Sequence, residues 1–261
     1  MAEQENIDRA RRFGGIARLY GRQGLSRFEM ASVCVVGVGG VGSWAAEALA
    51  RSGIGRVTLI DLDHVVESNV NRQLHALEGE MGRAKVEVLR NRIIAINPAC
   101  RVQAVEAFVA EDNLPQLIHS DLDFVLDCID AYRTKAALVA HCRRQRIPVV
   151  TIGAAGGQID PLRIRMADLS RTLHDPLLAK TRKQLRREFG YSKNPKRRFE
   201  IPAVYSMEQP RYPDDAGGVC MDKPAGGLSG LNCGGFGAVM TVTATFGLVA
   251  VSHILKKLSD A

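Results

Sequence analysis

The chain has 261 residues, of which 46% are apolar and 24% charged, with a formal net charge of +7. This size suffices for one large domain, or for one domain with an excursion from its core. The six cysteines form no C-x-x-C pair, which argues against structural zinc, and residues 1–12 lack the apolar core of a signal peptide. A reducing, cytoplasmic setting without disulfides is therefore predicted.

Hydrophobic periodicity predicts helices and strands that alternate along the first two thirds of the chain. In chain order we expect a helix over 6–30, a strand from Val33 into Gly37, a helix over 43–51, a strand over 56–60, a helix over 82–96, strands over 101–107 and 124–128, a helix over 131–146, and strands over 148–152 and 163–166. This alternation is typical of an α/β fold with a doubly wound, Rossmann-like, mostly parallel sheet.

Composition divides the chain into four expected segments: a helical segment over 1–30, a core over 31–168, a basic and glycine-rich excursion over 169–237, and an apolar helix over 238–261. Within the last two, residues 234–255 carry no Asp, Glu, Lys or Arg and are long enough to cross a bilayer. Their glycines and threonines favour a helix buried against the sheet, with membrane association as the alternative.

A basic run extends from Lys180 to Arg198 and holds nine Lys or Arg residues against one acid, Glu188. Such a run favours a phosphate-rich partner such as a nucleic acid. The alternative interpretation is a solvated helix and loop with no partner.

A glycine motif of the form G-x-G-x-x-G follows the first predicted strand, at Gly37, Gly39 and Gly42, with an additional glycine at Gly40. A helix follows immediately, and Asp61 closes the next strand nineteen residues after Gly42. This setting predicts a nucleotide site in which backbone N–H groups approach phosphates and Asp61 accepts from a ribose hydroxyl. The motif alone leaves NAD, FAD and ATP open.

A second group of polar residues lies where strands end or helices begin, at the edge of an open α/β sheet that binds ligands. It comprises Ser68, Asn69, Asn71, Arg72 and Gln73, then Lys85, and finally Asp127 and Asp130. Together they place two cations and several carboxylates around one nucleotide.

These motifs, in this order and spacing, resemble those of the ubiquitin-activating-like adenylating enzymes (the ThiF/MoeB/HesA group). The resemblance covers residues 10–155 and rests on five elements: G-x-G-G-x-G at 37–42, D-x-D at 61–63, N-x-N-R-Q at 69–73, Lys85, and D-x-x-D at 127–130. The opening at 12–21, the missing cysteine pairs and the basic run resemble the tRNA-modifying subgroup. That resemblance implies ATP-dependent cyclisation, a dehydration, of a threonylcarbamoyl group on a tRNA adenosine.

The resemblance also implies roles for the residues. Asn71, Arg72 and Lys85 contact the phosphates, Asp130 binds Mg²⁺, and Asp63 is a second candidate for that metal. Ser68, Asn69, Gln73 and Asp127 line the nucleotide, although Asp127 could instead only cap the next helix and Arg72 could pair with Asp61 or Asp63. Such enzymes are homodimers in which an N-terminal arginine, Arg12 or Arg18, reaches the partner subunit's triphosphate; the choice between the two stays open.

Further partners follow from the family: a sulfur-relay accessory protein of a cysteine desulfurase system, and a monovalent cation, K⁺ or Na⁺, held by a glycine-rich loop. Two other functions remain as alternatives. An activator of a small sulfur-carrier protein would use Cys233 or Cys220 as an acceptor, whereas intramolecular ring closure on tRNA needs no enzyme thiol. An NAD(P)-dependent oxidoreductase would explain only the glycines and Asp61.

Overall fold

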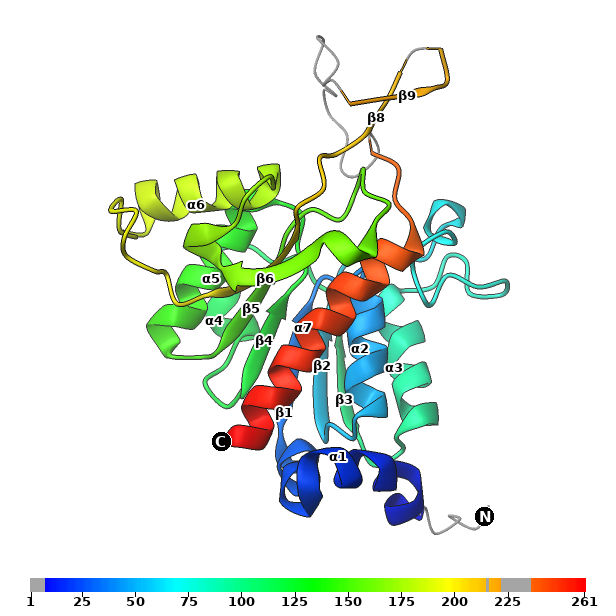
Figure 1. The fold of residues 1–261 in the computed structure, drawn as a ribbon. Helices are drawn as coiled ribbons and strands as arrows, with labels where there is room; N and C mark the ends of the chain where they lie inside the picture. The colour runs from blue at the N-terminus through cyan, green and yellow to red at the C-terminus, as the bar shows by residue number, and fades with distance from the viewer. Residues whose placement is uncertain (1–7, 215, 222–235) are drawn as a thin grey trace.

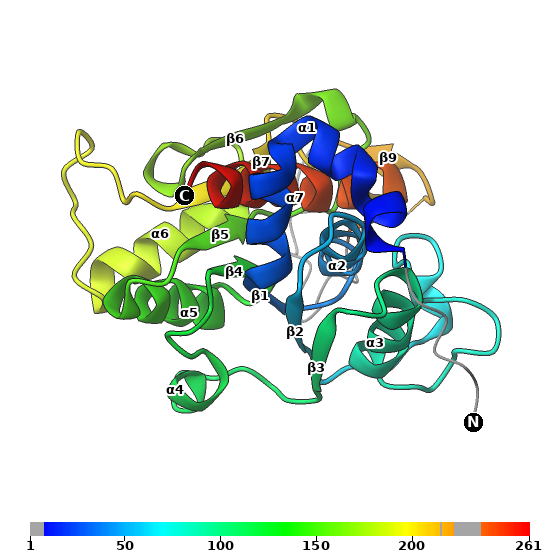
Figure 2. The same ribbon diagram turned by 90° about the horizontal axis from the view of Figure 1, so that it is seen from below.

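The structure, a computed structural model, describes residues 8–214, 216–221 and 236–261. A seven-stranded sheet of order β3-β2-β1-β4-β5-β7-β6 runs through the molecule, and helices cover both of its faces (Figures 1 and 2). Its strands are β1 (Ser32–Val36), β2 (Arg56–Ile60), β3 (Arg101–Val105), β4 (Phe124–Asp127), β5 (Val149–Ile152), β6 (Ile164–Asp168) and β7 (Pro202–Ser206). Neighbouring strands pair in parallel, except β6, which is antiparallel to β7.

The helices form two layers, one on each face of the sheet (Figure 2). The first layer contains α2 (Gly42–Arg51), α3 (Lys85–Ile96) and α7 (Met240–Asp260), and the second contains α4 (Leu114–Leu117), α5 (Tyr132–Gln145) and α6 (Pro176–Glu188). Helix α1 (Arg9–Met30) lies across the amino ends of the strands and packs against α7 (Figure 1). Short 3₁₀ turns span Glu67–Asn69, Pro161–Arg163 and Leu169–Arg171, and β8 (Tyr212–Pro213) pairs with β9 (Val219–Cys220) outside the main sheet. The predicted α/β fold with a mostly parallel sheet is confirmed.

The strand order reverses at β1, which pairs with β2 on one side and with β4 on the other. In open α/β sheets a crevice forms at such a switch point, outside the carboxyl ends of the strands. We call the edge at which β1, β2, β4 and β5 end the carboxyl edge. The glycine motif and the D-x-x-D motif both follow strands that end there.

Most predicted elements lie within a few residues of the observed ones, and three differences stand out. Helix α3 begins at Lys85 rather than at residue 82, because Gly82 occupies a turn with φ +82°. Helix α6 and strand β7 were not predicted. Because β7 lies in the sheet between β5 and β6, part of the segment 169–237 returns to the core instead of leaving it. The four-segment division as a whole stays a prediction.

Helix α7 packs against α2, α1 and the sheet through a buried stripe that includes Val242, Phe246, Ala250 and Ile254. Their four-residue spacing places them on one face of the helix. The prediction of a buried helix is therefore confirmed for the described part of the segment 234–255. Within the described residues, no helix combines the length and the apolar character that crossing a membrane requires, so the membrane alternative finds no support in α7.

Candidate active site

The glycine motif forms a tight loop between β1 and α2, in which Gly39 and Gly40 are half-buried. Gly37 has φ +85°, and its N–H donates to the Ile60 carbonyl at 2.9 Å. A Cβ at Gly42 would lie 1.9 Å from the Gly37 carbonyl oxygen, so no other residue fits this turn. The loop leads into the N-terminus of α2, where free N–H groups and the helix dipole favour an anion. This cradle fits a nucleotide phosphate.

Asp61 joins the glycine loop to the end of β2. One carboxylate oxygen accepts from the Val38 N–H at 2.7 Å and the other from the Asp63 N–H at 2.9 Å. A carboxylate has acceptor capacity beyond two hydrogen bonds. Asp61, which is half-buried, can therefore hold the loop in place and still accept from a ribose hydroxyl, as the sequence predicted.

The N-x-N-R-Q segment lies against the glycine loop. The side chain of Arg72 packs at Gly40, where a Cβ would be 3.2 Å from its Cγ, and its guanidinium donates to the Ser68 carbonyl at 2.7 Å and to the Asn71 amide oxygen at 3.0 Å. Arg72 thus hydrogen-bonds to Ser68 and Asn71 rather than to Asp61 or Asp63. The Trp44 indole also donates to the Arg72 carbonyl at 3.0 Å, which ties the segment to α2.

The other members of this segment are placed differently. Asn71 donates to the Ala238 carbonyl at 2.7 Å and so anchors the residues before α7, and the buried Asn69 accepts from the Val66 N–H at 3.2 Å within the turn. Gln73 is buried beside Gly39, and the oxygen of its side-chain amide (Oε1) has no hydrogen-bond partner. A buried polar atom without a partner is costly, so Gln73 has acceptor capacity to offer a ligand.

Lys85 and Asp63 form an ion pair at the carboxyl edge. The Lys85 ammonium lies 2.7 Å from the Asp63 carboxylate, and the Lys85 N–H donates to the Asp63 carbonyl at 3.0 Å. The lysine side chain is 6% exposed, whereas that of Asp63 is 71% exposed. The positive charge is therefore held in place by the protein while its counter-ion faces solvent.

His75 was given no role from the sequence, yet it is buried and neither of its ring nitrogens has a hydrogen-bond partner. Burial, and secondarily the nearby Lys85 charge, lower the pKa of His75 to about 4. It is consequently neutral near pH 7. The pattern N-x-N-R-Q-L-H gave no local signal that this histidine would turn inward.

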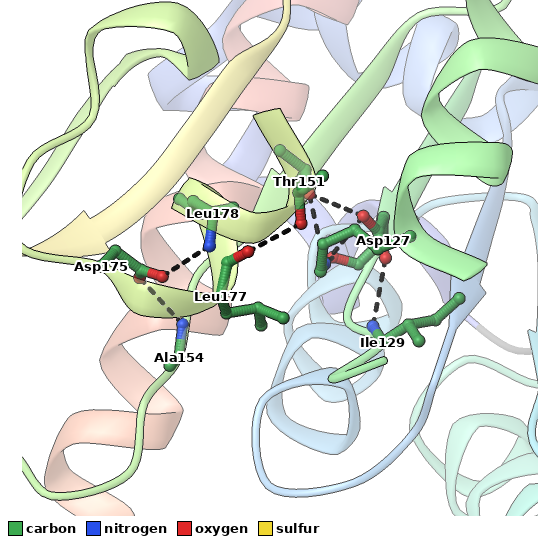
Figure 3. Close-up of polar contacts among 9 residues, drawn as sticks. Asp127, Ile129, Thr151, Ala154, Asp175, Leu177 and Leu178 are labelled. Atoms are coloured by element: carbon green, nitrogen blue, oxygen red, sulfur yellow. Dashed lines mark hydrogen bonds and ion pairs between the residues drawn. The ribbon is translucent and has the colours of Figure 1, made fainter. Parts of the chain in front are cut away.

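The two aspartates of the D-x-x-D motif have opposite environments. Asp127 is fully buried at the end of β4 and contacts Lys135, Thr151 and the Ile129 N–H (Figure 3). Asp130 is exposed in the loop that follows. The loop also borders the glycine motif, since a Cβ at Gly37 would lie 3.0 Å from the Cys128 carbonyl oxygen. Of the pair, Asp130 has the access that a ligand needs, whereas Asp127 is occupied inside the core.

Arg12 and Arg18 lie on α1, at the amino ends of the strands and away from the carboxyl edge of their own chain (Figure 1). The Arg12 guanidinium donates to the Ile96 carbonyl at the end of α3, at 2.8 Å. The structure thus does not bring either arginine to the glycine loop of the same chain.

Metal and thiol chemistry can be examined in the described part of the chain. No group of three or more His, Cys, Asp or Glu residues there is arranged to hold a metal. A Mg²⁺ bound together with nucleotide phosphates uses only one or two carboxylates, a role that the exposed Asp130 fits. Burial raises the pKa of the Cys34, Cys100, Cys128 and Cys142 thiols, which makes them poor nucleophiles; Cys233 lies outside the described residues.

A doubly wound sheet, a glycine loop that suits a phosphate and two cations at the sheet edge are typical of a nucleotide-binding protein of the adenylating kind. The model of the ThiF family matches residues 14–261. The chain belongs to the ThiF family, which confirms the resemblance found in the sequence.

Particular relatives are similar over nearly the whole chain. The tRNA threonylcarbamoyladenosine dehydratase of Escherichia coli (strain K12) is 54% identical over 95% of this chain and 93% of its own length. The protein of the same name from Haemophilus influenzae is 47% identical over 99% of this chain and 96% of its own. The crystal structure of the E. coli dehydratase in complex with ATP has a TM-score of 0.85 and 50% identity, covering 96% of this chain and 95% of that one.

Proposed function

We propose that this chain is an ATP-dependent tRNA threonylcarbamoyladenosine dehydratase. The observation that carries the proposal is its likeness, over 95% of its residues, to the E. coli enzyme of that name. A structure of that enzyme was solved with ATP, a substrate of adenylation, and another with AMP, which the overall reaction releases. The glycine cradle and the cations at the carboxyl edge of the present chain suit the same chemistry.

The proposed reaction has two steps. In the first, an oxygen of the threonyl carboxylate bonds to the α-phosphorus of ATP, and the bond to pyrophosphate breaks. In the second, an atom of the same threonylcarbamoyl group attacks the activated carbonyl carbon, and AMP leaves with the carboxylate oxygen. The nucleoside loses one water overall, ATP becomes AMP and pyrophosphate, and the enzyme supplies no nucleophile of its own.

The residues act mainly by positioning and by neutralising charge. Within the loop from Gly37 to Gly42, the N–H groups of Gly37 and Val38 already donate to Ile60 and Asp61, so the backbone N–H groups after Val38 are those proposed to hold phosphate oxygens, while Asp61 accepts from the ribose. Arg72 and Lys85 neutralise the charge that develops on the phosphates as pyrophosphate leaves. Ser68, Asn69, Asn71 and Gln73 are proposed to border the nucleotide, whereas Asp127 is enclosed in the core and is not.

Mg²⁺, when bound, supplies electrostatic neutralisation of the phosphates. Asp130 would hold it, because this exposed carboxylate follows β4 at the switch point, and Asp63 is the second candidate. A monovalent cation, K⁺ or Na⁺, remains a further proposal.

A homodimer is proposed because Arg12 and Arg18 lie at the far end of the sheet from their own glycine loop. Either arginine would need a second copy of the chain to reach a triphosphate. A sulfur-relay accessory protein stays a prediction of the family resemblance, and a cytoplasmic setting stays a prediction from the cysteine content and the N-terminal residues. Classification as a ligase is a further proposal, because ATP is cleaved as the new ring bond forms.

The alternative function, activation of a small sulfur-carrier protein, is not favoured. The relatives described above are named dehydratases, and the similarity to them extends over nearly their whole length. The oxidoreductase alternative does not explain Arg72 and Lys85, because hydride transfer has no evident role for these two cations.

The decisive test is to incubate the purified protein with ATP, Mg²⁺ and tRNA that carries threonylcarbamoyladenosine. We expect the modified nucleoside to lose the mass of one water while AMP and pyrophosphate form. A Lys85→Met variant serves as the inactive control. Pyrophosphate exchange without any change in nucleoside mass would contradict the tRNA substrate and leave only adenylation.

The tRNA is proposed to contact the basic run, which forms α6 and the loop 190–198. Within it Arg187 pairs with Glu188, and Arg186 lies over the Phe199 ring at 5.4 Å, whereas Lys193, Lys196, Arg197 and Arg198 are exposed. Replacing these four by Gln should weaken tRNA binding roughly tenfold and make its salt dependence shallower. Replacing the exposed Lys256 and Lys257 by Gln is the matched control. Equal affinities at several salt concentrations would show that the run is only a solvated face.

A further inference from the structure

The loop between β4 and α5 is closed by a single buried ion pair. Asp127 is the last residue of β4, and Lys135 lies in the first turn of α5. The Lys135 ammonium is 2.8 Å from the Asp127 carboxylate, and both side chains are 0% exposed. The loop that carries Asp130 therefore begins and ends at residues that bind each other.

Each partner makes further hydrogen bonds that leave little freedom to the loop. Lys135 also donates to the Asp127 carbonyl at 3.3 Å and to the Thr151 hydroxyl oxygen at 3.2 Å, so its ammonium has three acceptors. Asp127 accepts from the Thr151 hydroxyl at 2.6 Å with one oxygen and from the Ile129 N–H at 3.1 Å with the other (Figure 3). The last of these bonds sets the turn immediately before Asp130.

The surrounding strands fix this cluster to the sheet. Thr151 belongs to β5, which pairs with β4 at Asp127, and the Cys128 N–H donates to the Val36 carbonyl at the end of β1 at 2.8 Å. Hydrogen bonds thus attach the loop to β1, β4, β5 and α5 together. A displacement of the ion pair would move the loop relative to the glycine motif.

Stability alone does not account for such a cluster. Burying two charges costs desolvation that their attraction only partly repays, and apolar replacements of similar volume are often neutral or stabilising. The cluster does, however, hold its members in one geometry, because each hydrogen bond has a directional requirement.

We propose that Lys135 is a positioning residue which, through Asp127 and Thr151, holds the loop 128–131 so that Asp130 faces the bound nucleotide. The proposal rests on the adenylation function, in which Asp130 acts at the phosphates. Lys135 itself, being fully buried, does not touch substrate.

A second buried carboxylate limits the choice of variants. Asp175 caps α6, and it accepts from the Leu178 N–H at 2.8 Å and from the Ala154 N–H at 2.9 Å (Figure 3). Burial raises its pKa, and the Lys135 charge partly offsets that rise. Removing Lys135 alone would leave two carboxylates without this cation, so gentler variants are needed.

Two variants test the proposal. Thr151→Val removes one hydroxyl and keeps the ion pair, and its matched control is Thr181→Val, since Thr181 is equally buried and its hydroxyl donates to Leu177 within α6. Asp127→Asn combined with Lys135→Met removes both charges together. The first readout, made without ATP or metal, is hydrogen exchange of the amides from Cys128 to Ala131; the second is ATP–pyrophosphate exchange as a function of ATP and Mg²⁺.

We expect Thr151→Val to speed amide exchange of the loop about tenfold, because local opening becomes easier. The double variant should lower kcat about a hundredfold, as misplacement of a reacting group does, and should raise the Mg²⁺ concentration needed for half-maximal rate. KM for ATP should change by less than about twofold, because the glycine loop is intact. Thr181→Val should match the wild type in both readouts.

Unchanged loop protection in both variants would overturn the proposal, as would a freed loop with normal kcat. The two proposals fail separately. If the wild type catalysed no pyrophosphate exchange, the adenylation function would fall, while amide exchange would still decide whether the buried cluster holds the loop.

Discussion

The carboxyl edge contains two Asp–Lys pairs of nearly equal length and opposite surroundings. Asp63 and Lys85 lie 2.7 Å apart with Asp63 71% exposed, whereas Asp127 and Lys135 lie 2.8 Å apart with neither exposed. In water the attraction between two charges is weak, and in a protein interior it is strong but offset by desolvation. The same chemical pair is therefore suited to two tasks.

In the exposed pair, Asp63 and Lys85 (the open pair), the lysine can exchange its carboxylate partner for another anion. Because solvent already screens Asp63, a phosphate can take its place beside Lys85 at small cost. In the buried pair, Asp127 and Lys135 (the closed pair), neither residue can exchange its partner unless the surrounding structure unfolds. We therefore propose that substrate phosphates bind beside the first pair, whereas the second pair holds the Asp130 loop in shape.

The largest expected contrast is in stability. Lys135→Met leaves Asp127 buried and unpaired, and it should lower the free energy of unfolding by about 3–5 kcal/mol. Lys85→Met breaks only a pair that is open on one side, which should cost at most about 1 kcal/mol. Urea unfolding followed by fluorescence of the single tryptophan, Trp44, measures both. Equal losses would break the distinction between the pairs.

For catalysis the contrast between the two pairs should disappear. Lys85→Met should lower the rate of pyrophosphate release about a hundredfold, as loss of one preorganised cation at a developing charge does. Arg90→Met is the matched control, since Arg90 is on the same helix and pairs with Glu87 at 2.8 Å. A normal rate in the Lys85 variant would remove this lysine from the site.

A smaller effect concerns pH and His75, which is buried near the open pair. The folded state keeps His75 neutral down to about pH 4, whereas the unfolded chain protonates it near its ordinary pKa of 6.5. The unfolded state thus binds more protons in this window, so the free energy of unfolding should fall by about 2 kcal/mol as pH decreases from 6.5 toward 4. His75→Leu should flatten this part of the profile in urea unfolding at several pH values; an unaltered slope would show that other groups cause it.

Much of the fold could be predicted from local sequence patterns. The alternation of apolar strands and amphipathic helices, with Gly37, Gly42 and Asp61 at their junctions, is enough for a doubly wound sheet with a nucleotide loop. Helix α6 also carries local signals, since Asp175 and Pro176 stand at its start and Leu178 and Leu185 are buried at helical spacing.

Strand β7 shows where local patterns end. The strand, Pro202–Ser206, is short and mostly apolar, but nothing in its sequence indicates that it lies between β5 and β6 in the sheet. The order of strands in a sheet depends on contacts between segments far apart in the chain. The two-residue alternation of side chains describes a single strand and says nothing about which strand lies next to it.

By itself, the sequence determined the class of fold, the glycine turn and the stretches that supply charge to the carboxyl edge, because each of these depends on neighbouring residues. Only the tertiary structure decided that Asp127 is enclosed while Asp130, three residues later, is open. It also decided that Lys135 and Thr151 complete the enclosure. The reason is that burial is a property of what packs around a residue, and here β1, β4, β5 and α5 all have to meet before one carboxylate is shut off from water.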